Sequence, residues 1–170
     1  MKRSVSWWTA GLAIAGCTAG LTGCALGGSG GGDSGAVRSF TSFQTCLLTG
    51  SQGVAAGPAA LVWSGMGDAS QHTRALASYL AVAGPATPSA AVPFLGSLLA
   101  RGCDVIVAEG APEEAAVLAE AAKSRRVRFL LAGPGTTGPT AAGGNVAVVR
   151  GAGSGLRAAV AAAVEADTSS

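Results

Sequence analysis

Short, continuous apolar runs alternate with helix-periodic stretches along most of the chain. The apolar runs are typical of buried strands, and glycine or proline follows each of them closely. The segment Arg74–Val82 is also expected to be a strand, although its alanine content is compatible with a helix. The expected strands are Thr45–Thr49, Arg74–Val82, Cys103–Ala108, Val127–Leu131 and Asn145–Val149.

The stretches between these runs repeat apolar residues at helical spacing. One helix is expected from Pro58 to near Ser70, and a second from Pro88 to the stop at Gly102. A third opens at 110–114 with proline and acids in its first turn, and its expected last turn carries basic residues, the arrangement that the helix dipole favours. Those basic residues are Lys123, Arg125 and Arg126, and a final helix is expected over Leu156–Ala166.

This alternation of strand and helix predicts the fold class. Parallel neighbouring strands need crossover connections, and the helices supply them. Continuously apolar strands agree, because a parallel sheet is covered on both faces. We therefore expect an α/β domain over residues 38–170, in three layers, with a mostly parallel sheet of about five strands.

The first residues of the chain have the pattern of a secretory signal. Lys2 and Arg3 are basic, and Val5–Gly20 contains no charge. The run ends at Leu21–Cys24 (LTGC), which resembles the lipobox of bacterial lipoproteins, whose cysteine is diacylated and becomes the new N-terminus. That resemblance implies a signal peptide over residues 1–23, lipidation at Cys24, and a location on the extracytoplasmic face of the cell membrane.

Two alternatives to this interpretation remain open. Cys17 also ends a lipobox-like sequence, but it would leave an unusually short signal. An uncleaved membrane helix over Val5–Leu26 would nearly span a bilayer, although its glycines weaken a long helix. The glycine-rich segment Gly27–Gly35 favours the lipoprotein, because residues 24–37 then form a flexible tether.

Composition and charge restrict the function classes. The chain has 170 residues, of which 49% are hydrophobic and 5% aromatic, a globular composition. The net charge of +2 comes from the signal, because nine basic and nine acidic residues remain after its removal. A neutral domain favours no nucleic-acid partner. Cys46 and Cys103 also remain, and they admit either one disulfide or two buried free thiols.

Neither cofactor nor metal is expected. Gly151–Gly155 follows a strand and precedes a helix, but the third glycine of a dinucleotide fingerprint falls at Leu156 and the required acid lies beyond the last residue. His72 is the single histidine, so a metal cluster lacks ligands. The basic group at 125–128 is expected to be a solvated edge. We therefore expect that the protein is not an enzyme.

Three segments resemble the basic membrane protein family, nucleoside-binding lipoproteins that serve ABC importers: Cys46–Thr49 (CLLT), Trp63–Ala69 (WSGMGDA) and Gly102–Gly110 (GCDVIVAEG). Family members are two-lobed, periplasmic-binding-type proteins that hold the solute between lobes. The resemblance covers roughly residues 43–160, the N-terminal lobe. It implies a nucleoside-like ligand and an ABC permease as partner. It also supports a Cys46–Cys103 disulfide, because the first and third strands are neighbours in the expected sheet order.

The chain departs from the family pattern at two ligand-gripping positions. Gly50 follows Thr49 where the family has an acid, and 57–60 (GPAA) replaces a polar, aromatic run. Each buried polar group of a ligand that is left without its hydrogen-bond partner weakens binding by about 1–3 kcal/mol. Ligands of open α/β sheets collect at the carboxyl ends of strands. The candidate ligand-binding residues there are Thr49, Gly50, Ser51, Gln52, Glu109 and Gly110, with Gly133 nearby.

Two functions are therefore expected from the sequence. The first is a lipid-anchored solute-binding protein of a nucleoside-type importer, in a truncated or degenerate form. The second is an envelope lipoprotein that binds another protein and has no transport ligand.

Overall fold

A computed structural model of the protein describes residues 39–55, 57–135 and 144–170. The signal sequence, the alternative Cys17, Cys24, the tether and the membrane-helix alternative at Val5–Leu26 all lie outside the described residues. Among the helices that are described, none combines the length and apolar character that crossing a bilayer requires.

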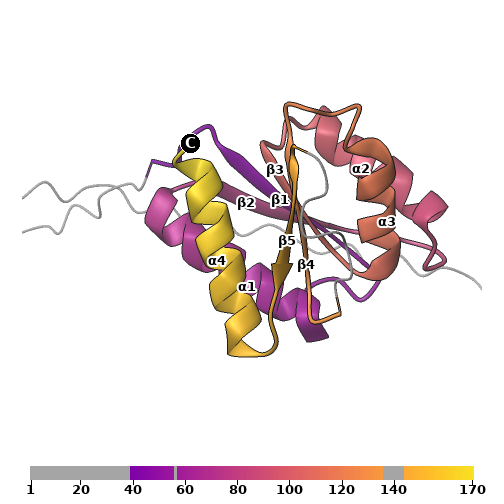
Figure 1. Ribbon diagram of the computed structural model, residues 1–170, viewed down its shortest axis with the longest axis horizontal. Coiled ribbons are helices and arrows are strands. Elements are labelled where there is room, and N and C mark those ends of the chain that lie inside the picture. The colour runs from indigo at the N-terminus through magenta and orange to yellow at the C-terminus, as the bar shows by residue number, and fades with distance from the viewer. Residues whose placement is uncertain (1–38, 56, 136–143) are drawn as a thin grey trace, which may run out of the picture. The chain divides into compact units, whose positions relative to one another are not determined.

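The described residues form one all-parallel, five-stranded sheet in the order β2-β1-β3-β4-β5, flanked by four helices (Figure 1). The strand at Arg74–Val82 is confirmed, and so is the α/β fold class. The strands are β1 (Gln44–Thr49), β2 (Leu76–Ala81), β3 (Val105–Glu109), β4 (Arg128–Gly133) and β5 (Val146–Arg150). The helices are α1 (Gly57–Thr73), α2 (Pro88–Ala100), α3 (Ala111–Glu120) and α4 (Ser154–Thr168).

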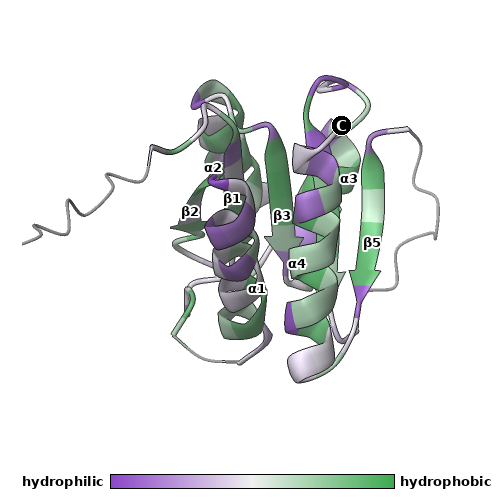
Figure 2. Cartoon of the chain, turned by 90° about the vertical axis from the view of Figure 1, so that its left-hand side faces the viewer, coloured by the Kyte–Doolittle hydropathy of each residue, from purple (hydrophilic) through white to green (hydrophobic). Residues whose placement is uncertain are grey.

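Helices cover both faces of the sheet. α1 and α4 lie on one face, and α2 and α3 lie on the other (Figures 1 and 2). Side chains alternate between the faces along each strand, so Leu48 of β1 packs under α2 and α3 whereas Leu47 packs under α1 and α4. Both are fully buried, and burial of such a side chain stabilises the fold by roughly 1.5–3 kcal/mol.

One expected helix boundary is wrong. α3 ends at Glu120, so Lys123, Arg125 and Arg126 lie in the turns that follow it rather than in its last turn. The cause is Asn145, which precedes β5. Its amide Nδ2 lies 3.0 to 3.1 Å from the carbonyl oxygens of Ala121, Ser124 and Val127. These bonds satisfy carbonyls that a longer helix would have paired internally.

Cys46 and Cys103 form a disulfide, with their Cα atoms 6.0 Å apart. This confirms the expected pairing. The register of β1 and β3 places Ile106 opposite Cys46, so Cys103 lies before β3 and the bridge runs diagonally between the strands. Both cysteines are buried in the apolar cluster beneath α2 and α3.

α1 and α4 approach each other closely at Gly65. A Cβ atom added there would collide with the backbone carbonyl of Arg157. Two ion pairs also join these helices, both on the C-terminal side of Gly65 along α1. Arg157 binds both carboxylate oxygens of Asp68, at 2.6 and 2.7 Å, and His72 lies 2.8 Å from Glu165.

Candidate functional site

A half-open cavity of about 440 Å³ lies at the carboxyl ends of β1, β2 and β3. β1 leads to α1 on one face of the sheet, whereas β3 leads to α3 on the other, so the loops that follow these adjacent strands diverge. Such a switch point is where ligands of open α/β sheets bind. The cavity is lined by Thr49, Gly50, Ser51, Gln52, Gly53, Gly57, Pro58, Ala59, Val82, Gly84, Pro85, Ala86, Glu109, Gly110, Pro112 and Glu113.

The structure brings all six predicted ligand-binding residues together in this lining. Thr49 ends β1, and Gly50, Ser51 and Gln52 form the turn after it; Glu109 ends β3, and Gly110 precedes α3. Gly133 does not line the main cavity. It lies with Glu109 and Gly110 beside a second hollow of about 260 Å³, at the end of β4.

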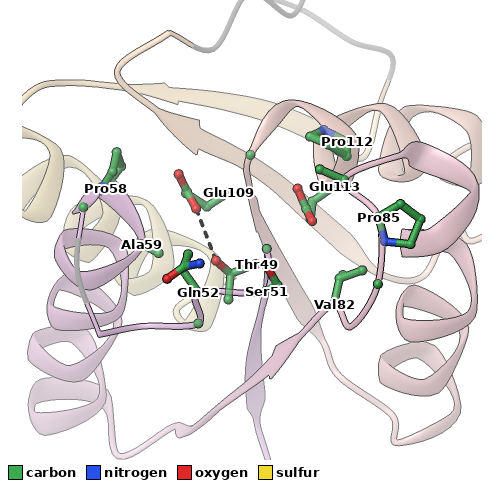
Figure 3. Close-up of a pocket in the computed structure, with 16 residues that line it drawn as sticks. Thr49, Ser51, Gln52, Pro58, Ala59, Val82, Pro85, Glu109, Pro112 and Glu113 are labelled. Atoms are coloured by element: carbon green, nitrogen blue, oxygen red, sulfur yellow. Dashed lines mark hydrogen bonds between the residues drawn. The ribbon is translucent and has the colours of Figure 1, made fainter.

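Thr49 and Glu109 face each other across the adjacent strands β1 and β3 (Figure 3). The Thr49 hydroxyl donates a hydrogen bond of 3.2 Å to Oε2 of Glu109. Burial raises the pKa of Glu109, the Thr49 hydrogen bond opposes that rise, and the nearby charges of Glu113 and Glu114 add to it. Glu109 therefore presents a half-buried acceptor to the cavity.

Glu113 is the functional candidate that sequence reasoning missed. It lies in the first turn of α3 with 3% of its surface exposed, and burial raises its pKa while its own backbone amide opposes the rise. The side chain lies directly over Gly110, where φ is 108° and an added Cβ would collide with the Glu113 carboxylate. The sequence did offer a signal for Glu113, because this first turn follows closely after the end of β3.

Two further parts of the lining were also missed. The loop after β2 contributes Val82 and Gly84–Ala86, and the start of α1 contributes Gly57–Ala59. In Figure 3 Pro58 stands on one side of the cavity and Pro85 on the other. Thr49 was selected because ligands bind at the carboxyl ends of strands in open α/β sheets. The same rule applied to the end of β2 would have selected this loop.

The lining favours particular ligand chemistry. It combines glycine, proline, alanine and valine with Thr49, Ser51 and Gln52 and with the acceptors Glu109 and Glu113. Among the described residues that line it, none is lysine, arginine or histidine. The Glu113 carboxylate lies at the start of α3, where its charge disfavours a phosphate at that helix terminus. An uncharged or cationic ligand that donates hydrogen bonds fits this lining, and a phosphorylated one is repelled.

Two other predicted features have structural roles. Gly151 forms part of the turn into α4, where an added Cβ would lie 2.7 Å from the backbone N and Cα of Leu156. His72 pairs with Glu165 on the surface. Among the described residues, no group of three or more His, Cys, Asp or Glu side chains is placed to hold a metal ion.

No protein-family model, curated protein or solved structure matches this chain at a significant level.

Proposed function

We propose that this protein is an exported, lipid-anchored binding lobe that takes up a small uncharged or cationic solute for an importer of the nucleoside-transporting ABC class. The observation that carries the proposal is the cavity at the switch point of the sheet, whose described lining consists of acceptors, other uncharged polar groups and apolar groups, without a basic side chain. Uncharged ligands with several donor groups, such as nucleosides, satisfy the Glu109 and Glu113 carboxyl oxygens without charge repulsion.

The disulfide supports export. Cys46 and Cys103 are bonded and buried. Disulfides persist in oxidising compartments and are rare in the reducing cytosol. An extracytoplasmic location, with Cys24 acylated and the tether at 24–37 attaching the domain to the membrane, accounts for the bond.

A thermal-shift experiment on the full chain tests the solute proposal. Nucleosides and primary amines at millimolar concentration should raise the melting temperature, whereas the matching nucleoside monophosphates should not. At a ligand concentration ten times Kd the gain is about 1.4 kcal/mol. That gain corresponds to a shift of roughly 3–6 °C in a domain of this size.

The variant Glu109→Gln sharpens the experiment. Glutamine keeps an oxygen for the Thr49 hydroxyl but removes the charge, so the discrimination against monophosphates should weaken. Glu120→Gln, which alters a carboxylate on α3 outside the cavity lining, is the matched control.

Equal shifts of the melting temperature with nucleosides and monophosphates in the unaltered protein would exclude the acceptor-lined cavity as the site. An absence of any shift would favour the protein-binding lipoprotein.

The anchor has a separate test. Intact-mass analysis of the protein from membranes should show a chain that begins at a diacylated Cys24. A chain that retains Met1, or one that begins at Cys17, would contradict the proposed cleavage site.

A further inference from the structure

We propose that the edge of the domain opposite the cavity is a membrane-facing surface that contacts anionic phospholipid headgroups. We call this surface the basic face and define it as Arg74, Arg101, Lys123, Arg125 and Arg126. The inference goes beyond solute binding, and its orienting role rests on the proposed anchor at Cys24.

The basic face is assembled by the parallel topology. In such a sheet every connecting helix ends at the edge where the strands begin. Arg74 follows α1, Arg101 follows α2, and residues 123–126 follow α3, so three helix ends place their cations at this one edge. All five side chains belong to exposed residues. Sequence alone predicted a solvated basic group at 125–128, and the fold extends it to Arg74 and Arg101.

Acidic residues at this edge form ion pairs with side chains other than the four arginines, or accept a backbone hydrogen bond. Glu120 pairs with Lys123, Glu165 with His72, and Asp167 with Arg128. Asp104 accepts a hydrogen bond from the backbone amide of Gln44. Among the described residues, none of Arg74, Arg101, Arg125 and Arg126 has a carboxylate partner in an ion pair. The carboxyl edge is more acidic, since it carries Glu109, Glu113 and Glu114 beside Arg150.

The path of the chain points to a membrane as the partner. The described chain enters β1 at this same edge, where the backbone amide of Thr41 bonds the carbonyl of Arg74 at 2.9 Å. Phe40 is 57% exposed and lines a hollow together with Arg74. Aromatic and basic side chains together are typical of the membrane interface.

The proposed anchor keeps this face near lipid. Residues 25–38 separate Cys24 from the described domain, and the length of that chain segment limits the distance between the proposed anchor and this face to at most about 50 Å. Each cation near an anionic surface adds roughly a fivefold factor to membrane affinity. Contact through the basic face turns the cavity edge, with Glu109, away from the bilayer and toward soluble ligands.

Hydrogen–deuterium exchange of the full acylated chain tests the proposal. The protein is placed on vesicles of phosphatidylcholine alone or of phosphatidylcholine with phosphatidylglycerol. On the anionic vesicles, exchange of the backbone amides at 121–127 should slow at least roughly threefold. Exchange at 50–55 and 110–114, at the cavity edge, should not change. About 1 M NaCl, where the screening length is ~3 Å, should abolish the difference.

The double variant Arg125→Gln with Arg126→Gln should lose most of this protection while its melting temperature stays unchanged. Arg150→Gln, at the carboxyl end of β5, is the matched control and should keep the protection. Soluble glycerol phosphate at the same headgroup concentration should not protect 121–127. Protection by glycerol phosphate would replace the surface with a discrete phosphate site and overturn the proposal.

The result separates the basic face from the anchor. Acylated protein with identical exchange on both vesicle types would overturn the basic face and leave the anchor standing. If intact-mass analysis shows that the native protein is not acylated, and that protein still shows salt-sensitive protection on anionic vesicles, the basic face stands and the proposed anchor falls.

Discussion

The α1–α4 layer and the α2–α3 layer cover opposite faces of one sheet with different interactions. α1 and α4 touch at Gly65, and exposed ion pairs join them at Asp68 and His72. The α2–α3 face has a disulfide buried among apolar side chains, and the amide of Asn145 fixes the turn after α3. One layer therefore depends on close backbone contact and surface charge, and the other on a covalent bond and burial.

This difference shows which conditions each layer responds to. The disulfide responds to the redox state of the compartment and is insensitive to salt. The Asp68–Arg157 pair responds to pH and salt, because both side chains are partly exposed. In an oxidising compartment the disulfide therefore persists at any salt concentration.

The largest expected effect is loss of the disulfide. Replacement of Cys46 and Cys103 by alanine should lower the free energy of unfolding by about 4 kcal/mol, because the bond closes a long loop in the unfolded chain. Urea unfolding with and without dithiothreitol measures the effect. The reductant should destabilise the unaltered protein and leave the double variant unchanged, and equal stability of the oxidised and reduced protein would contradict the prediction.

A smaller effect is expected at the α1–α4 contact. Gly65→Ala should destabilise the protein by about 1–3 kcal/mol, because the added methyl group collides with the carbonyl of Arg157. Gly67→Ala is the matched control on the same helix, since no atom lies within 4 Å of its added Cβ. Alanine favours a helix over glycine by up to about 1 kcal/mol, so this change should stabilise. If both substitutions shifted the melting temperature in the same direction, the result would count against the close contact.

The smallest effect is expected at Asp68. The Arg157 hydrogen bonds hold the pKa of Asp68 below its ordinary value. The ion pair therefore stabilises the fold above the ordinary aspartate pKa, and this contribution is lost as the pH falls through the lowered value. Asp68→Asn should be slightly less stable than the unaltered protein at neutral pH. The urea midpoints of the two proteins should converge on acidification and at high salt, and a constant gap across pH would show that the charge is not responsible.

Much of the architecture followed from local sequence. The run Val105–Ala108 is apolar at every position, and the structure buries it on both sides as the central strand β3. A strand of this type requires helices on both faces, which is why the alternating pattern predicted the three layers. The candidate site followed from the same logic, because Thr49 and Glu109 end two strands and topology then places them side by side.

Two features were missed for different reasons: Glu113 looks like its neighbour in the sequence, and the end of α3 depends on a distant segment. Nothing local distinguishes Glu113 from Glu114, yet only the first packs over Gly110 and faces the cavity. The end of α3 was misplaced because Asn145, more than twenty residues later, supplies the hydrogen bonds that fix the following turn. Propensity and capping rules use only neighbouring residues, so they cannot predict a contact between segments more than twenty residues apart.

The order of apolar runs and glycine-bounded turns determined by itself that this protein forms a covered parallel sheet with polar groups at its carboxyl edge. Local hydrophobic periodicity suffices for that, because it fixes each element and the face it buries. Only the tertiary structure decided which groups meet: the diagonal disulfide, the buried Glu113, the glycine between α1 and α4, and the cations gathered from three helix ends. Those contacts depend on strand order and register, which bring together residues that lie far apart along the chain.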